Sequence, residues 1–114
     1  MTAKLRAAVW ALRARRTARQ QLPSGLAAVR LPPVPDLPET AAGAVRTALR
    51  VVRATCLERA LVAQAWHQAH GASRDLVVGV TSPRDFRAHA WLEGDPPCHD
   101  EALEELLRRR PVAH

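Results

Sequence analysis

One cysteine of the chain stands where a helix is expected to begin. Thr55 has the side chain of a helix N-cap, and Glu58, three residues on, can complete a capping box. Cys56 is then the first helical residue, where backbone N–H groups and the positive end of the helix dipole favour a thiolate over a neutral thiol. This position predicts a nucleophile. An isolated cysteine is more often a small packing residue, so the prediction depends on the residues that follow.

A histidine and a carboxylate follow at positions that can complete a catalytic set. His89 lies in an alternating segment expected to be a strand, and Asp100 comes after the next turn. In acyl transfer by a thiol, the imidazole takes the thiol proton and later protonates the leaving amine, while a carboxylate orients the imidazole. Asp95 is a rival for the third role, although an aspartate in an Asp-Pro turn often caps its own backbone. The set is therefore Cys56 and His89 with Asp100 or Asp95.

The elements before the cysteine are predicted to be two helices joined by a strap. Residues 3 to about 20 form a basic amphipathic helix, which needs an apolar surface to pack on and whose stripe consists of Leu5, Ala8, Val9 and Leu12. Prolines interrupt residues 21–38, so this segment is a linker or an extended strap. A second helix spans about residues 39–53, with an apolar face made of Val45, Ala48, Leu49 and Val52.

The cysteine helix and the segments after it suggest an α+β fold. The helix should end near residue 70, before Gly71, and its apolar stripe consists of Leu57, Ala60, Leu61 and Ala65. Strands are expected at residues 75–80 and 87–93. Residues 101–110 read as a helical tail because their acids precede their arginines. Helices first and strands later favour a small antiparallel sheet packed on the cysteine helix.

Length and charge restrict the function classes. The 114 residues fit one domain, divided into a helix and strap at residues 1–38 and a core at residues 39–114. The net charge of +6 is concentrated before Asp36, but only 4% of residues are aromatic, so a solvated basic helix is favoured over a nucleic-acid surface. The chain lacks an apolar run of about 20 residues and a secretory signal, so we expect no membrane span and a cytoplasmic location. There Cys56 and Cys98 would stay reduced.

No cofactor or metal is expected. Cys56, His89, Cys98 and His99 are residue types that bind zinc, but they do not show the paired C-x-x-C or H-x-x-x-H spacing of a zinc site. A glycine loop for phosphate is absent as well.

Three sequence stretches resemble one enzyme family. These are CLERAL at residues 56–61, LVVGV at residues 76–80 and FRAHAWLE at residues 86–93. Over about residues 50–101 the chain resembles the transglutaminase-like leader peptidases of lasso-peptide biosynthesis, the B-protein family, in its stand-alone form. The resemblance implies a papain-like, transglutaminase-like fold with Cys56, His89 and Asp100 as the catalytic triad.

The resemblance also implies the substrate and the partners. The substrate would be a ribosomally made lasso-peptide precursor, cut at the end of its leader. A separate protein would recognise the leader, and an ATP-dependent cyclase would act on the product. We name Trp91 and Phe86 as candidate substrate-binding residues, Trp91 because it shares the strand face of His89.

Two departures from the family pattern stand out. The turn before Asp100 is about one residue shorter than the pattern, which keeps Asp95 in contention. Papain-like enzymes usually place an oxyanion-binding glutamine upstream of the cysteine, whereas the residue six positions before Cys56 is Arg50. The Cys56 backbone N–H is one natural donor, and the second donor is left unassigned.

Two other functions remain open. In a transglutaminase of the same fold an amine, instead of water, would resolve the acyl-enzyme. A non-enzymatic basic adaptor would bind a protein or a nucleic acid and keep Cys56 and His89 as core residues. If a leader-binding partner exists, the exposed face of residues 3–20 is the most available surface for it.

Overall fold

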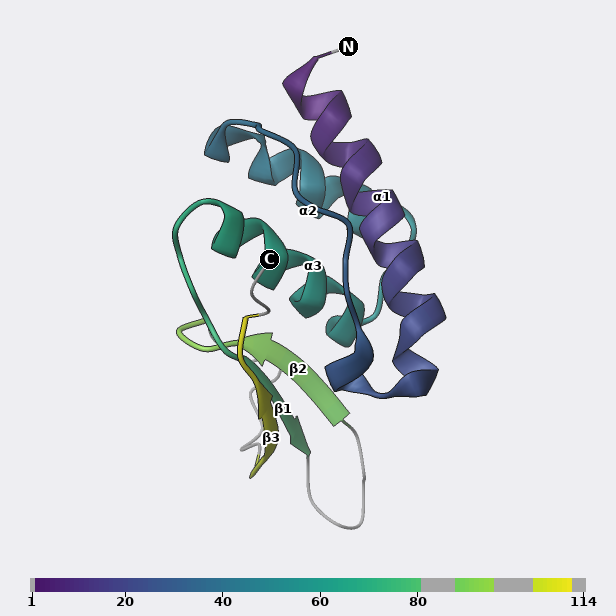
Figure 1. Cartoon of the computed structure of the whole chain (residues 1–114), viewed down its shortest axis with the longest axis vertical. Coiled ribbons are helices and arrows are strands. Elements are labelled where there is room, and N and C mark those ends of the chain that lie inside the picture. The colour runs from purple at the N-terminus through teal and green to yellow at the C-terminus, as the bar shows by residue number, and fades with distance from the viewer. Residues whose placement is uncertain (1, 81–87, 96–103, 112–114) are drawn as a thin grey trace.

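The computed structural model describes residues 2–80, 88–95 and 104–111, which form three helices and a three-stranded antiparallel sheet (Figure 1). This is the predicted α+β class. The helices and strands are α1 (Ala3–Gln21), α2 (Ala42–Val51), α3 (Cys56–Ala69), β1 (Leu76–Val80), β2 (Ala88–Leu92) and β3 (Glu104–Arg109). Helix α3 lies between the other two helices and the sheet (Figure 1). It therefore connects the two halves of the molecule.

Helix α1 buries a different face from the predicted one. The predicted stripe is largely exposed, with Leu5 51%, Val9 39% and Leu12 40% accessible. The buried face consists of Ala7, Trp10, Ala11, Ala14 and Ala18. Alanines spaced along one side let α1 approach α2 closely, and this close packing outweighs the burial of larger side chains on the other face. The prediction for the stripe was wrong, and an apolar row is left on the surface.

The segment between α1 and α2 is a strap, as predicted. It contains two short 3₁₀ turns, Leu22–Ser24 and Leu26–Ala28, and then runs extended up to a third, Glu39–Ala41. The Trp10 indole N–H donates to the Pro32 carbonyl (3.1 Å), which fixes the strap on α1. Its buried apolar residues are Val29, Leu31 and Leu37. The strap is therefore part of the core.

Helix α2 ends two residues earlier than predicted. Val45, Ala48 and Leu49 are buried as expected, whereas Val52 is half-buried and already outside the helix. The chain then turns through Arg53 at φ 54°, in the left-handed region. The Ala54 N–H bonds to the Leu49 carbonyl (2.9 Å), as in a Schellman C-cap. This turn normally takes glycine, so arginine gave no signal for it.

Helix α3 matches its predicted bounds. It begins at Cys56 and is followed by Gly71 at φ 86°, which supplies the expected left-handed turn. Its buried surface is wider than the predicted stripe, because neighbours cover it on several sides: Leu57 and Ala65 are half-buried, and the fully buried residues are Glu58, Ala60, Leu61, Val62, Gln64 and Trp66.

The sheet has the order β2-β1-β3, with Val78 of β1 opposite Ala90 of β2. Strands β1 and β2 lie where the sequence predicts them. The predicted helical tail at residues 101–110 is wrong, because Glu104–Arg109 forms β3 against β1. Helix propensity is a weak preference, and the second edge of β1 offers a backbone ladder that overrides it. The buried Gln64 amide donates to the carbonyls of Arg74 and Arg109 (2.9 Å each), which ties α3 to this side of the sheet.

His70 joins the end of α3 to the strap. Its Nδ1 lies 2.7 Å from the Trp66 carbonyl oxygen, and its Nε2 lies 2.8 Å from the Leu37 carbonyl oxygen. Both ring nitrogens can donate only in the imidazolium, so these bonds raise the pKa of His70 above 6.5. His67, one turn earlier, has its pKa lowered, first by burial and then by Arg74.

We predict that His70→Ala costs more stability at pH 5.5 than at pH 8. Because the folded-state pKa of His70 is raised, its two hydrogen bonds stabilise the fold fully below pH 6.5. This stabilisation is lost as the pH rises through the folded-state pKa. The loss should be about 1 kcal/mol at pH 5.5, as for partly exposed hydrogen bonds to a charged group. Urea unfolding at both pH values measures it. His67→Ala is the matched control and should show the opposite trend, because its lowered pKa disfavours the folded state in acid.

Candidate active site

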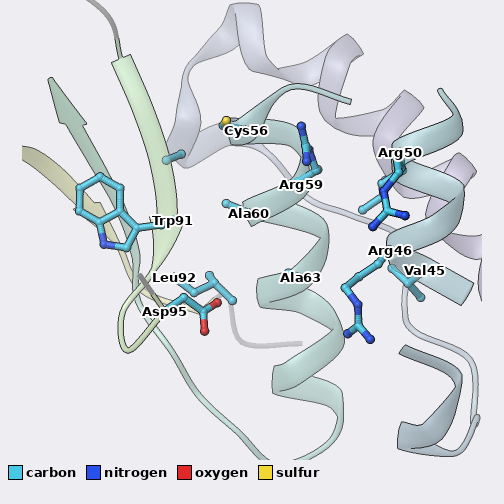
Figure 2. Close-up of a pocket in the computed structure, with 12 residues that line it drawn as sticks. Val45, Arg46, Arg50, Cys56, Arg59, Ala60, Ala63, Trp91, Leu92 and Asp95 are labelled. Atoms are coloured by element: carbon cyan, nitrogen blue, oxygen red, sulfur yellow. The ribbon is translucent and has the colours of Figure 1, made fainter. Parts of the chain in front are cut away.

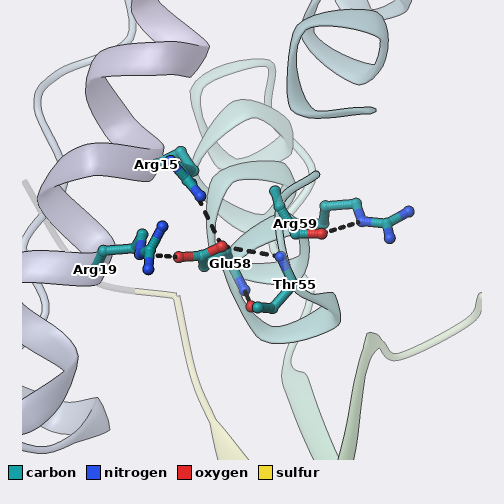
Figure 3. A network of polar contacts seen from close by, with 6 residues as sticks. Arg15, Arg19, Thr55, Glu58 and Arg59 are labelled. Atoms are coloured by element: carbon teal, nitrogen blue, oxygen red, sulfur yellow. Dashed lines mark hydrogen bonds and ion pairs between the residues drawn. The ribbon is translucent and has the colours of Figure 1, made fainter. Parts of the chain in front are cut away.

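The start of α3 fixes the position of the cysteine. The Glu58 N–H donates to Thr55 Oγ1 (3.1 Å), and the Thr55 N–H donates to Glu58 Oε1 (2.9 Å). The predicted capping box is therefore confirmed (Figure 3). Cys56 is the first helical residue. The cysteine side chain is half-buried.

The Glu58 carboxylate does more than cap its own helix. It is 3% exposed and is reached by two arginines of α1, with Arg15 Nε at 3.4 Å from Oε1 and Arg19 Nε at 3.5 Å from Oε2 (Figure 3). A buried carboxylate is costly unless it is paired and hydrogen-bonded, and here both conditions are met. The sequence indicated Glu58 as a cap but gave no sign that arginines of the first helix would complete its shell.

Cys56 and His89 border the same hollow. It has a volume of about 230 Å³, and its remaining lining residues are Thr55, Leu57, Val78 and Ala90. His89 pairs with Gly79 of β1. Because glycine has no side chain, the surface of β1 next to His89 is open. The structure therefore brings together the two residues that sequence reasoning placed at the centre of the site, although they are separated by a helix, a strand and a connection.

The strand pleat divides β2 into two faces. Ala90 and Leu92 are buried in the core. Trp91 lines a second, larger groove next to the hollow, and its indole is directed away from α3 (Figure 2). Alternation puts His89 on the Trp91 side of the pleat, opposite the face that packs on α3. Since β2 is an edge strand of the described sheet, this face is close to the hollow, which His89 lines together with Ala90. Phe86 and Asp100, with Cys98 and His99, fall outside the described residues.

A larger groove of about 380 Å³ continues from the thiol (Figure 2). It runs between α2, α3 and β2, and it shares Cys56 and Ala90 with the smaller hollow. Arginines line it from two helices: Arg46 and Arg50 from α2, and Arg59 from α3. The sequence related Arg50 to Cys56 only as the residue that stands where papain-like enzymes usually have glutamine, and it gave no sign that Arg46 and Arg59 would line the same groove.

Asp95 lies at the far end of this groove from the thiol. Its Oδ1 is 2.7 Å from Arg74 Nη2. It also acts on His67, where its charge opposes the lowering of the His67 pKa by burial and by Arg74. From Cys56 to His67, α3 advances about 16 Å at 1.5 Å per residue. Asp95 therefore lies near the C-terminal end of α3, away from the hollow that Cys56 and His89 border.

Two further properties concern the described part of the chain. Nowhere in it do three or more His, Cys, Asp or Glu side chains gather closely enough to hold a metal ion. None of its helices has the length and apolar character needed to cross a membrane.

Thiol-dependent acyl transfer uses a nucleophile with a base beside it, and here Cys56 at a helix start and His89 of β2 line one hollow. The sequence profile of the transglutaminase-like superfamily matches residues 1–112. The chain therefore belongs to the transglutaminase-like superfamily, which includes cysteine peptidases and acyltransferases. It matches no curated protein and no solved structure.

We predict that Glu58→Gln lowers the free energy of unfolding by about 1–3 kcal/mol, because the amide keeps the shape of the cap but loses its charge-assisted bonds to Arg15 and Arg19. Urea unfolding measures this loss. The exposed Glu39, changed to Gln, is the matched control and should move the midpoint little. Equal effects of the two substitutions would contradict the role given to the buried carboxylate.

Proposed function

We propose that the protein is a cysteine peptidase that removes the leader from a ribosomally made lasso-peptide precursor. The observation that carries the proposal is the common hollow of Cys56 and His89, together with the motif stretches around both residues. The superfamily alone leaves a choice between peptidases and acyltransferases. The resemblance of CLERAL and FRAHAWLE to the leader peptidases favours the peptidase.

In the proposed reaction, the His89 imidazole takes the Cys56 proton, and the thiolate attacks the carbonyl carbon at the end of the leader. The start of α3 favours this thiolate through its N–H groups and dipole. The tetrahedral oxyanion collapses as the imidazolium protonates the leaving amine, which is the new N-terminus of the product. Water, deprotonated by His89, then attacks the thioester and releases the leader. The Cys56 backbone N–H is the proposed first oxyanion donor.

Asp100 is the proposed third member of the triad. An orienting carboxylate must reach the histidine ring, which calls for hydrogen-bond distance. Asp95 is bound to Arg74 near the other end of α3, and its charge is already compensated there. This placement argues against Asp95 and leaves the aspartate that the resemblance indicates.

Leader recognition is proposed to lie in a separate protein. The basic helix α1 exposes Leu5, Val9 and Leu12 in a row, and arginines flank this row. Such a surface suits an acidic partner with an apolar contact patch. The partner would raise the effective concentration of the scissile bond at Cys56.

We predict that Cys56→Ala, Cys56→Ser and His89→Ala each reduce leader removal at least about a thousandfold while the protein stays folded. The double variant Cys56→Ala/His89→Ala should be no worse than either single variant, because residues that act as one unit are not additive. Mass spectrometry of the precursor, with unfolding curves of each variant, measures both properties.

In the assay, the purified chain is mixed with the precursor, with and without the separate leader-binding protein. Without that protein cleavage should slow, and full-rate cleavage would place leader recognition within this chain. Near-wild-type cleavage by Cys56→Ala would remove the peptidase proposal. If the released leader ends in an amide bond to an added amine, and not in a free carboxylate, the reaction is transglutamination.

We predict that Asp100→Asn impairs cleavage more than Asp95→Asn does. The first change removes the proposed orienter of His89, whereas the second removes a charge that pairs with Arg74. The same cleavage assay gives the order of the two losses. The reverse order would transfer the orienting role to Asp95.

A further inference from the structure

The groove beside Cys56 has one cationic wall. Arg46 and Arg50 are one helical turn apart on α2, and Arg59 extends from the side of α3 that faces α2 (Figure 2). All three side chains are exposed. Figure 2 shows their guanidinium groups along the α2 side of the groove. Arg59 Nε donates to the Ala54 carbonyl (3.1 Å), a neutral partner that leaves its charge uncompensated. This wall therefore carries three positive charges within one groove.

The carboxylate in the groove does not neutralise this wall. Asp95 is paired with Arg74 at 2.7 Å. Within residues 2–80, 88–95 and 104–111, no ion pair shorter than 4 Å joins Arg46, Arg50 or Arg59 to an acid. The remaining lining is apolar and includes Val45, Leu49, Ala60 and Ala63. An apolar surface beside three guanidinium groups suits a chain that carries both an apolar and an acidic side chain.

The position of the thiol sets how far such a chain can reach. The groove follows α3 from Cys56 to Ala63, which is about 10 Å along the helix axis. An extended peptide advances about 3.3 Å per residue, so about three residues fit beside the thiol. Any segment held there has one end at Cys56. The groove is thus in line with the reacting bond, and a side chain in it lies within about three residues of that bond.

We propose that this groove is a substrate subsite for a peptide segment with an aspartate or glutamate within about three residues of the bond that Cys56 attacks, held by Arg46, Arg50 and Arg59. The inference rests on the proposed function, because it takes the thiol as the attacking atom. The arginines are specificity-determining residues, and they select the substrate without taking part in bond breaking. A nucleic acid is less suited to a groove of 380 Å³ with an apolar lining.

The test uses disulfide trapping on the folded full-length chain. The probes are tetrapeptides of alanine and valine with one cysteine activated as a thiopyridyl disulfide and with either glutamate or glutamine two residues away. The cysteine comes first in one pair of probes and last in the other, so the two directions are tested separately. The Cys56 thiolate displaces pyridine-2-thione and keeps the peptide, and tryptic mass spectrometry maps the bound peptide to Cys56 or Cys98.

In at least one direction, the glutamate probe should label Cys56 about tenfold faster than the glutamine probe at low salt, and the ratio should fall in 0.5 M salt to about two. The double variant Arg46→Gln/Arg50→Gln should bring the low-salt ratio close to one. Lys4→Gln/Arg16→Gln, exposed residues of α1 outside the groove, removes the same net charge and should keep the ratio. Iodoacetamide labelling of each variant corrects for changes in the thiol itself.

A ratio near one in both directions would overturn the subsite, as would equal losses in the two double variants. Labelling by iodoacetamide without labelling by any peptide would show that the groove does not lead a peptide to the thiol, and would overturn it too. Trapping does not depend on hydrolysis. An arginine-dependent preference in a chain that leaves the precursor uncut would therefore support the subsite and overturn the peptidase proposal alone.

Discussion

The carboxylate of Glu58 is the contact on which the candidate site depends. It caps the helix that begins with Cys56, and it is also the buried anion that Arg15 and Arg19 of α1 compensate. Without these arginines its burial would cost several kcal/mol. The first helix is therefore a support of the cysteine position, even though none of its residues borders the hollow that Cys56 and His89 share.

Helix α3 carries the site because both halves of the molecule pack on it. On one side, the alanine face of α1 lies close to α2, and the Glu58 contacts join α1 to α3. On the other side, Gln64 donates to the carbonyl of Arg74, just before β1, and to that of Arg109, at the end of β3. Ala90 and Leu92 of β2 are buried with α3 in one core. The position of β2 relative to the thiol therefore depends on small side chains and on a buried amide that lies away from the hollow.

Local signals in the sequence were enough for the cysteine helix, the strap and the first two strands, because caps, prolines and alternation act over a few residues. The motifs around Cys56 and His89 were enough to expect that the two residues lie near each other, and they do line one hollow. Long-range effects were missed. Residues 104–109 have helix-forming composition, and only the edge of β1 makes them a strand. The buried face of α1 was misjudged because close packing selected alanines over leucine and valine. The arginine wall joins two helices and has no local pattern.

Strand β1 lies between a strand that directly follows it and one that is translated later, and this order affects biosynthesis. On the ribosome, the cysteine helix and β2 emerge before Glu104, so β1 has an unpaired edge during that interval. Unpaired edges are templates for intermolecular strand addition. During the same interval the Gln64 amide lacks the Arg109 carbonyl, one of its two hydrogen-bond acceptors. A chain that ends near residue 100 would lack β3 and keep this edge unpaired, so such fragments are expected to aggregate more readily than the 114-residue chain.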